Sequence, residues 1–132
     1  MLTRVVYEKK GTTKTFKIVD AGMNDLIRPT LYEGWHQIVP ARKPATSETE
    51  VVDVVGPICE SGDFLAQNRE LAPVGEGDLL AVMSAGAYGF TMASNYNTRP
   101  LPAEVLVSGS EAHLVRERQT LDDVIRGERL LD

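Results

Sequence analysis

The middle of the chain reads EVVDVVGPICESGDFLA, residues 50–66, and it indicates both a strand and a place where polar groups are displayed. Four valines among residues 50–55 predict a strand that is buried on both faces. The glycines and the proline that follow predict a turn. The only cysteine, Cys59, lies in this turn beside Glu60, so the end of a strand can hold a thiol and a carboxylate in fixed positions.

The segments on either side of this strand are also short and rich in β-forming residues. Residues 4–9 and 12–20 predict a hairpin around Gly11, because glycine accepts the positive φ of a tight turn. Further strands are expected at residues 79–83, 103–107 and 112–117, and the last two should pair as a hairpin across residues 108–110. Irregular backbone is expected at residues 66–73, and short helices near Pro29 and at residues 121–126 after Thr120. This spacing predicts a mainly β fold, an antiparallel β-barrel or sandwich with a few short helices.

The composition is that of one globular domain. The 132 residues are 42% apolar and 25% charged, which is enough for a core and too little for two ordinary domains. The net charge of −5 argues against nucleic acid as a partner, because phosphate binding needs a basic face. The four lysines at positions 9, 10, 14 and 17 are expected on the solvated side of the first hairpin.

Other features of the sequence indicate a compartment. A single cysteine excludes an internal disulfide and is typical of a reducing cytoplasm. The first residues lack the apolar core and cleavage site of a signal peptide, and no apolar run reaches the roughly 20 residues that span a bilayer. We therefore expect a cytoplasmic domain without a membrane partner.

Two pairs of residues could carry chemistry. Cys59 could donate a proton and Glu60 could pair with a substrate ammonium group, or they could be a small core residue and a surface charge. Arg28 and Tyr32 stand four residues apart and would share one face of a helical turn. There a guanidinium group can bind a carboxylate and a hydroxyl can add a hydrogen bond, although an arginine packed on an aromatic ring is the alternative.

A third candidate is the glycine-flanked segment at residues 86–90, GAYGF. Its glycines let the backbone approach a ligand, and Tyr88 could donate to a phosphate oxygen. A purely structural turn is the alternative, since the segment lacks the spacing of a Walker loop or a Rossmann fingerprint. His36 and His113 have no partners at ligand spacing, so no metal site is expected.

Three segments together resemble the diaminopimelate decarboxylase family: DAGMNDLIRPTLY at residues 20–32, GPICESGDFLA at residues 56–66, and GAYGFTMASNYNTRPLPAEVLV at residues 86–107. The similarity extends from about Val5 to Leu130, and the glutamate after the cysteine differs from the aspartate of ornithine-type relatives. The resemblance implies the C-terminal β-domain, like that of alanine racemase, of a fold-type III enzyme. Such enzymes use pyridoxal 5'-phosphate to decarboxylate meso-2,6-diaminopimelate to L-lysine.

The resemblance also implies a role for each candidate residue. Arg28 and Tyr32 would hold the distal carboxylate of diaminopimelate, and Glu60 would bind its distal amino group. Cys59 would be the acid that returns a proton to the substrate carbon after carbon dioxide leaves. Tyr88 would contact both the cofactor phosphate and the substrate. In the family, the cysteine and the glutamate enter the active site of the other subunit, which implies a homodimer.

A complete member of this family begins with a (β/α)₈ barrel that carries the cofactor lysine, and no segment of this chain resembles that barrel. We therefore expect residues 1–132 to form a single β-domain that is inactive alone and binds no pyridoxal phosphate by itself. Surface left uncovered by the missing part should drive formation of a dimer or higher oligomer. Two alternatives stay open: a non-catalytic dimerisation or regulatory module derived from the enzyme, and an unrelated β-barrel binding module.

Overall fold

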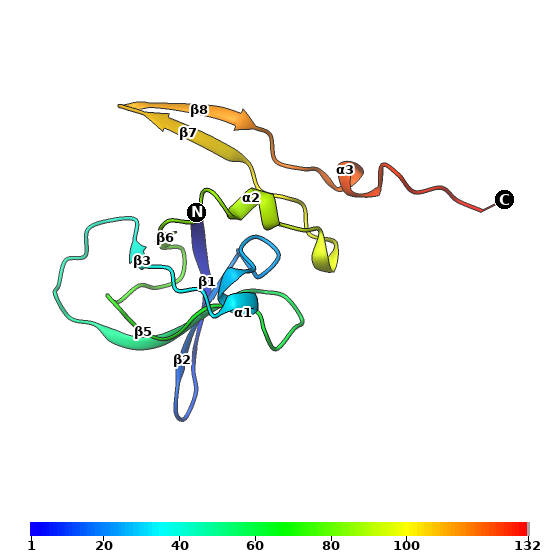
Figure 1. The fold of residues 1–132 in the computed structure, drawn as a ribbon. Helices are drawn as coiled ribbons and strands as arrows, with labels where there is room; N and C mark the ends of the chain where they lie inside the picture. Colours follow the sequence, from blue (N-terminus) through cyan, green and yellow to red (C-terminus); the bar gives the residue numbers. More distant parts are fainter. Residues whose placement is uncertain (132) are drawn as a thin grey trace.

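The computed structural model describes residues 1–131, and its main feature is a curved six-stranded sheet (Figure 1). The strands are β1 (Leu2–Lys10), β2 (Thr15–Val19), β3 (Ile38–Pro40), β4 (Glu50–Val55), β5 (Phe64–Leu71) and β6 (Leu79–Val82), in the order β3-β6-β1-β2-β4-β5. Neighbouring strands are antiparallel except β2 and β4, which are parallel. The predicted mainly β fold is confirmed, with one parallel pair that the sequence pattern did not predict.

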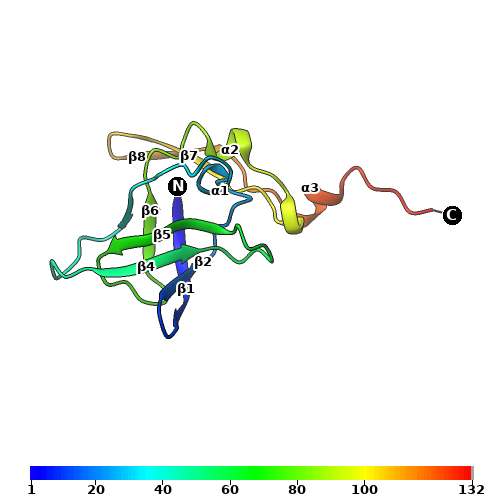
Figure 2. The same ribbon diagram turned by 60° about the horizontal axis from the view of Figure 1, so that its bottom comes forward.

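The sheet curls into a nearly closed barrel (Figure 2). Strand β1 pairs with β6 through residues 2–4 and with β2 through residues 5–10, and a register shift between Val5 and Tyr7 interrupts the pairing with β2. Near the two edges of the sheet, Arg69 of β5 donates to the backbone carbonyl of His36, just before β3, at 2.5 Å. The Arg69 guanidinium also lies 4.5 Å from the centre of the Trp35 ring. These side-chain contacts join the two edges of the sheet, between which no backbone pairing is found in residues 1–131.

Inward-facing residues of every long strand fill the barrel. Val5, Val19, Val54, Leu65 and Leu80 are at most 1% exposed, as the period-two alternation of strands requires. On β4 the prediction of burial on both faces is correct for residues 52–54 and wrong for residue 51, which is 58% exposed. The predicted irregular backbone at residues 66–73 is also wrong, because most of it belongs to β5.

Lys17 contradicts the expectation that the early lysines lie on a solvated face. It is 1% exposed because it alternates inward with Val19 on β2. Its ammonium group donates to the carboxylates of Glu8 and Glu50, the latter at 2.6 Å, and to the carbonyl of Val74 at 2.7 Å. Burial lowers the pKa of Lys17, but the hydrogen bonds to Glu50 and Glu8 outweigh it and raise the pKa above its ordinary value.

The remaining elements lie toward one end of the barrel and beyond it. They are α1 (Arg28–Tyr32), α2 (Gly89–Met92), the 3₁₀ turn η1 (Tyr96–Thr98), α3 (Leu121–Ile125), and a separate hairpin of β7 (Glu104–Ser108) and β8 (Glu111–Arg116). The predicted hairpin and the predicted helix after Thr120 are confirmed, and a capping box between Thr120 and Asp123 begins α3. Among residues 1–131, no helix is both long and apolar enough to cross a bilayer.

Candidate functional site

Asp63 organises the turn that presents Cys59 and Glu60. It is 5% exposed, and its carboxylate accepts the backbone N–H of Ile58 at 2.5 Å. Its own backbone N–H donates to the carbonyl of Glu60 at 3.0 Å. With the carboxylate turned inward, the side chains of Cys59 and Glu60 are left on the exposed side of the turn. The turn thus displays a thiol and a carboxylate on a backbone held by several hydrogen bonds.

The same carboxylate ties this turn to the loop before α1. Asp63 also accepts the backbone N–H of Met23, at 2.7 Å. The approach is so close that a Cβ atom at Gly56 would lie 2.5 Å from the Asp63 carboxylate and 2.6 Å from the Cα atom of Gly22. A second link follows, because the Thr30 hydroxyl on α1 donates to the carbonyl of Gly62. Hydrogen bonds therefore hold together two of the three family-like segments, residues 20–32 and residues 56–66.

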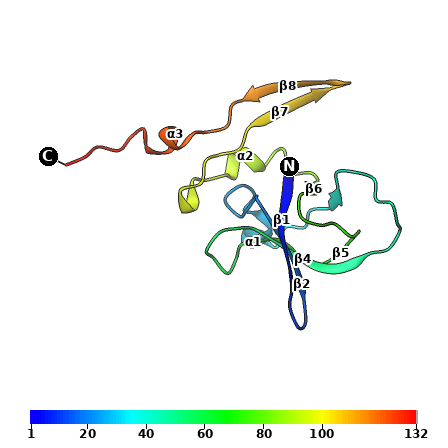
Figure 3. The ribbon, with the colours of Figure 1, turned by 180° about the vertical axis from the view of Figure 1, so that it is seen from behind.

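Helix α1 is a single turn with Pro29 near its start, where the missing N–H costs nothing, and a left-handed Glu33 at its end. It presents Arg28, whose guanidinium carbon lies 4.3 Å from the centre of the Tyr88 ring. Tyr88 precedes α2, so this stacking contact joins the first segment to the third. Figure 3 shows α1 and the turn after β4 on one side of the sheet, with α2 above them.

A further contact joins the third segment to the second. The Tyr96 hydroxyl donates to the Glu60 carboxylate at 3.2 Å. This hydrogen bond, together with the negative charge of Glu60, raises the pKa of Tyr96. The backbone N–H of Ser94 also donates to the carbonyl of Asn24 at 2.9 Å. All three segments thus meet at one end of the barrel.

The structure brings Arg28 into contact with Tyr88, and it places Glu60 in contact with Tyr96. Tyr32 and Cys59 lie on the same connected segments, exposed and without a hydrogen bond to the other candidates among residues 1–131. Sequence reasoning missed Tyr96, although it follows the glycine–tyrosine turn within the same segment. It also missed Asp63, for which the signal was an aspartate directly after a glycine in a turn.

The histidines lie outside this site. His36 is 2% exposed, and its Nδ1 atom is 2.9 Å from the carbonyl of Met83. His113 lies on the separate hairpin beside Glu111. Within residues 1–131 no three His, Cys, Asp or Glu side chains are grouped as metal ligands would be.

Comparison with known proteins gives consistent matches. A family model described as "Pyridoxal-dependent decarboxylase, C-terminal sheet domain" matches residues 1–86. The chain is 58% identical over 131 residues to diaminopimelate decarboxylase of Pseudomonas aeruginosa, and the match covers 99% of the chain and 31% of that protein. It is 53% identical over 124 residues to the diaminopimelate decarboxylase of Vibrio cholerae, covering 94% of the chain and 29% of that protein.

Solved structures agree with these relatives. The crystal structure of diaminopimelate decarboxylase from M. jannaschii in co-complex with L-lysine is 41% identical, with a TM-score of 0.92. That match covers 98% of this chain and 30% of the other. The chain therefore spans less than a third of the proteins that it matches.

Proposed function

The chain belongs to the family of C-terminal sheet domains of pyridoxal-dependent decarboxylases, and we propose that it is this domain of a diaminopimelate decarboxylase. The complete enzyme would release carbon dioxide from meso-2,6-diaminopimelate and form L-lysine. The observation that carries the proposal is the meeting of three family-like segments through the Arg28–Tyr88 stack and the Glu60–Tyr96 hydrogen bond. The 58% identity to the Pseudomonas aeruginosa relative supports the choice of substrate.

Arg28 and Tyr32 bind the distal carboxylate of the substrate. Among residues 1–131 no carboxylate lies within ion-pair distance of Arg28, so its N–H donors are available. The guanidinium carbon lies 4.3 Å from the centre of the Tyr88 ring, and an arginine held over an aromatic ring in this way keeps N–H donors for a bidentate carboxylate. Tyr32, 59% exposed at the other end of α1, adds a hydroxyl donor.

Glu60 pairs with the distal ammonium group, and Cys59 handles a proton. Pyridoxal phosphate, when bound, draws electrons away from the carbon that loses carbon dioxide. The Cys59 thiol donates its proton to that carbon, in place of the departed carboxyl group, and becomes a thiolate. Once the product leaves and water enters the site, the thiolate recovers a proton from water.

The residues present fit one edge of a pyridoxal phosphate site. Tyr88 lies between Gly86 and Gly89, and a Cβ atom added at either glycine would meet nothing within 4 Å. The hydroxyl of Tyr88 makes no hydrogen bond within residues 1–131, so it can donate to a phosphate oxygen. The lysine that holds the cofactor would come from the part of the enzyme outside this chain.

A partner completes the site. Cys59 and Glu60 are exposed on a rigid turn, which suits insertion into the active site of a second subunit. The hairpin β7–β8 is exposed on both faces, with Val105, Leu106 and Val107 between 55% and 67% exposed. A two-stranded hairpin is marginally stable in water, so these side chains pack against the rest of the enzyme.

A chimera tests the proposal. This chain would replace the matching 131 residues of the Pseudomonas aeruginosa relative, and lysine formation from meso-diaminopimelate would be measured. We expect the chimera to retain activity within about tenfold of its parent, and the chain alone to form no lysine.

Arg28→Met and Glu60→Gln provide the site-directed comparison. Each removes a charge that pairs with a charged substrate group, so each should lower kcat/KM at least about tenfold in the chimera. A folded chimera that binds pyridoxal phosphate but forms no lysine would reject the proposal and favour a non-catalytic module.

A further inference from the structure

The turn that carries Tyr96 has an unusual backbone. Asn97 and Thr98 follow it with φ values of 61° and 56°, both in the left-handed region. Asparagine tolerates this region, but a β-branched threonine does so at a cost. Two such residues in succession persist only where surrounding contacts fix them, and such strain is concentrated at functional sites.

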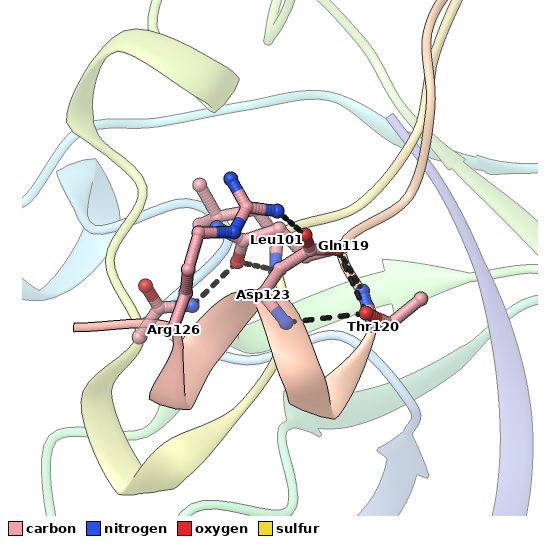
Figure 4. A network of polar contacts seen from close by, with 6 residues as sticks. Leu101, Gln119, Thr120, Asp123 and Arg126 are labelled. Atoms are coloured by element: carbon pink, nitrogen blue, oxygen red, sulfur yellow. Dashed lines mark hydrogen bonds and ion pairs between the residues drawn. The ribbon is translucent and has the colours of Figure 1, made fainter. Parts of the chain in front are cut away.

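Several contacts hold this turn in place. The Asn95 side-chain amide donates to the carbonyl of Arg99 at 2.8 Å and to the side chain of Gln119 at 2.7 Å. The same Gln119 oxygen accepts the backbone N–H of Leu101 at 2.9 Å (Figure 4). The Arg99 guanidinium donates to the carbonyl of Asp20, in the first segment. Hydrogen bonds therefore hold the turn to Asp20, far before it in the sequence, and to Gln119, after it.

Figure 4 shows how the Gln119 side of these contacts is supported. Gln119 directly precedes Thr120, the N-cap of α3, which exchanges hydrogen bonds with Asp123. Asp123 also pairs with Arg126 one turn on. Helix α3 thus fixes the position of Gln119, and Gln119 in turn fixes the two ends of the turn around Tyr96.

These contacts fix the turn so that the Tyr96 hydroxyl is directed at the Glu60 carboxylate. Tyr96 reaches the Glu60 carboxylate at 3.2 Å through Oε2 and leaves Oε1 without a hydrogen bond among residues 1–131. A hydrogen bond on one oxygen restricts the rotation of an exposed carboxylate and leaves the other oxygen for a cation. Without it, Glu60 would hold its place only by its own rotamer preference, because its side chain is exposed.

We infer that Tyr96 is a positioning residue, which holds the Glu60 carboxylate in the orientation that receives the far ammonium group of the substrate. This inference rests on the proposed function. It assigns part of the substrate specificity to the turn at residues 94–99: the site selects amino acids with a second positive charge at the far end. An analogue without the distal amino group, 2-aminopimelate, gains nothing from Tyr96.

The test uses Tyr96→Phe, which removes one oxygen atom, in the chimera. We expect KM for meso-diaminopimelate to rise about three- to tenfold while kcat changes less than about twofold, because a charged hydrogen bond is lost from binding. In a Glu60→Gln background the same substitution should change KM less than about twofold, because the two residues act as a unit. Equal rises in both backgrounds, or no rise in either, would overturn the inference.

Two controls separate this role from simple loss of structure. Tyr7→Phe removes a hydroxyl from a residue 55% exposed on β1, for which no hydrogen bond is found within residues 1–131, and it should leave KM unchanged. Tyr96→Phe should not weaken inhibition of the chimera by 2-aminopimelate, whereas a collapsed turn would weaken it. Weaker inhibition would contradict a positioning role.

A titration of the chain itself keeps this inference distinct from the proposed function. Replacement of Glu60 by glutamine should bring the raised pKa of Tyr96 back toward its ordinary value, measured by NMR on the 132-residue chain. If Glu60 affects the Tyr96 titration but the chimera forms no lysine, the proposed function is rejected, and with it the substrate role of Tyr96. An unchanged Tyr96 titration would reject the contact itself.

Discussion

Asp63 joins two segments of the chain by accepting the backbone N–H of Met23, 40 residues away, at 2.7 Å. Its other carboxylate oxygen accepts the N–H of Ile58 within its own turn. One buried carboxylate therefore fixes both the shape of the Cys59–Glu60 turn and its distance from α1. The arrangement of the proposed site thus depends on a buried residue that is not one of the proposed substrate-binding residues.

Asp63→Asn should separate these two segments. An amide has a single acceptor oxygen, so its NH₂ group would face one of the two backbone N–H donors. We expect the free energy of unfolding in urea to fall by about 1–3 kcal/mol, the cost of an unsatisfied buried group, with an unchanged m-value. Asp122→Asn, on an exposed residue of α3, is the matched control and should change stability by less than about 0.5 kcal/mol. Equal stability of both variants would show that the Asp63 hydrogen bonds are not required.

Gly56→Ala tests the close approach of the same two segments. The new Cβ atom would lie 2.6 Å from the backbone of Gly22, which cannot move as a flexible side chain would. Overpacking of this kind should cost about 1–3 kcal/mol in urea unfolding. Gly75→Ala is the control, because a Cβ atom there would meet nothing within 4 Å, and its effect should be neutral or slightly stabilising. A Gly56→Ala variant as stable as Gly75→Ala would contradict the tight packing.

The sequence predicted individual helices and hairpins better than the pairing of strands that are distant in the sequence. The hairpin at residues 104–116 and the capped helix after Thr120 follow from turn chemistry within a few residues, and both are confirmed. The parallel pairing of β2 with β4 depends on contacts between distant segments, which no local pattern reports. Strand β5 was missed because a register shift against β4 and a left-handed Asn68 interrupt its alternation.

The candidate site shows the same contrast between what the local sequence indicates and what only the fold determines. Resemblance indicated three segments as candidates for the site, and the structure brings those segments together at one end of the barrel. Tyr96 could not be chosen from the sequence, because several polar residues surround it and only the fold selects the one that reaches Glu60. Lys17 was assigned to solvent because a lysine is almost never buried unless it is paired, and its partners lie on other strands.

The buried Lys17 cluster predicts how stability depends on acid. Its hydrogen bond to Glu8 lowers the pKa of that carboxyl below its ordinary value of 4.5. A lowered folded-state pKa contributes stability above pH 4.5, and this contribution is lost as the pH falls through the folded-state pKa. The free energy of unfolding should therefore decrease from pH 5 downward. In Glu8→Gln the decrease should be shallower, whereas Glu76→Gln, at an exposed turn, should follow the unmodified chain. Identical slopes for the two variants would contradict a role for the cluster.

The exposed hairpin gives the last prediction. The backbone hydrogen bonds between β7 and β8 have no covering layer, since every residue of β8 is exposed. Amides in such a hairpin open with a small free energy, so hydrogen exchange at residues 104–116 should be fast in the isolated chain, at dilutions at which it is monomeric, and slow in β4. In the chimera the same amides should become protected, because the hairpin is proposed to pack against the rest of the enzyme. Light scattering at micromolar concentration provides the complementary measurement: exposed apolar surface should make the isolated chain a dimer or larger. A monodisperse monomer, or a hairpin that stays unprotected in the chimera, would place the interface elsewhere.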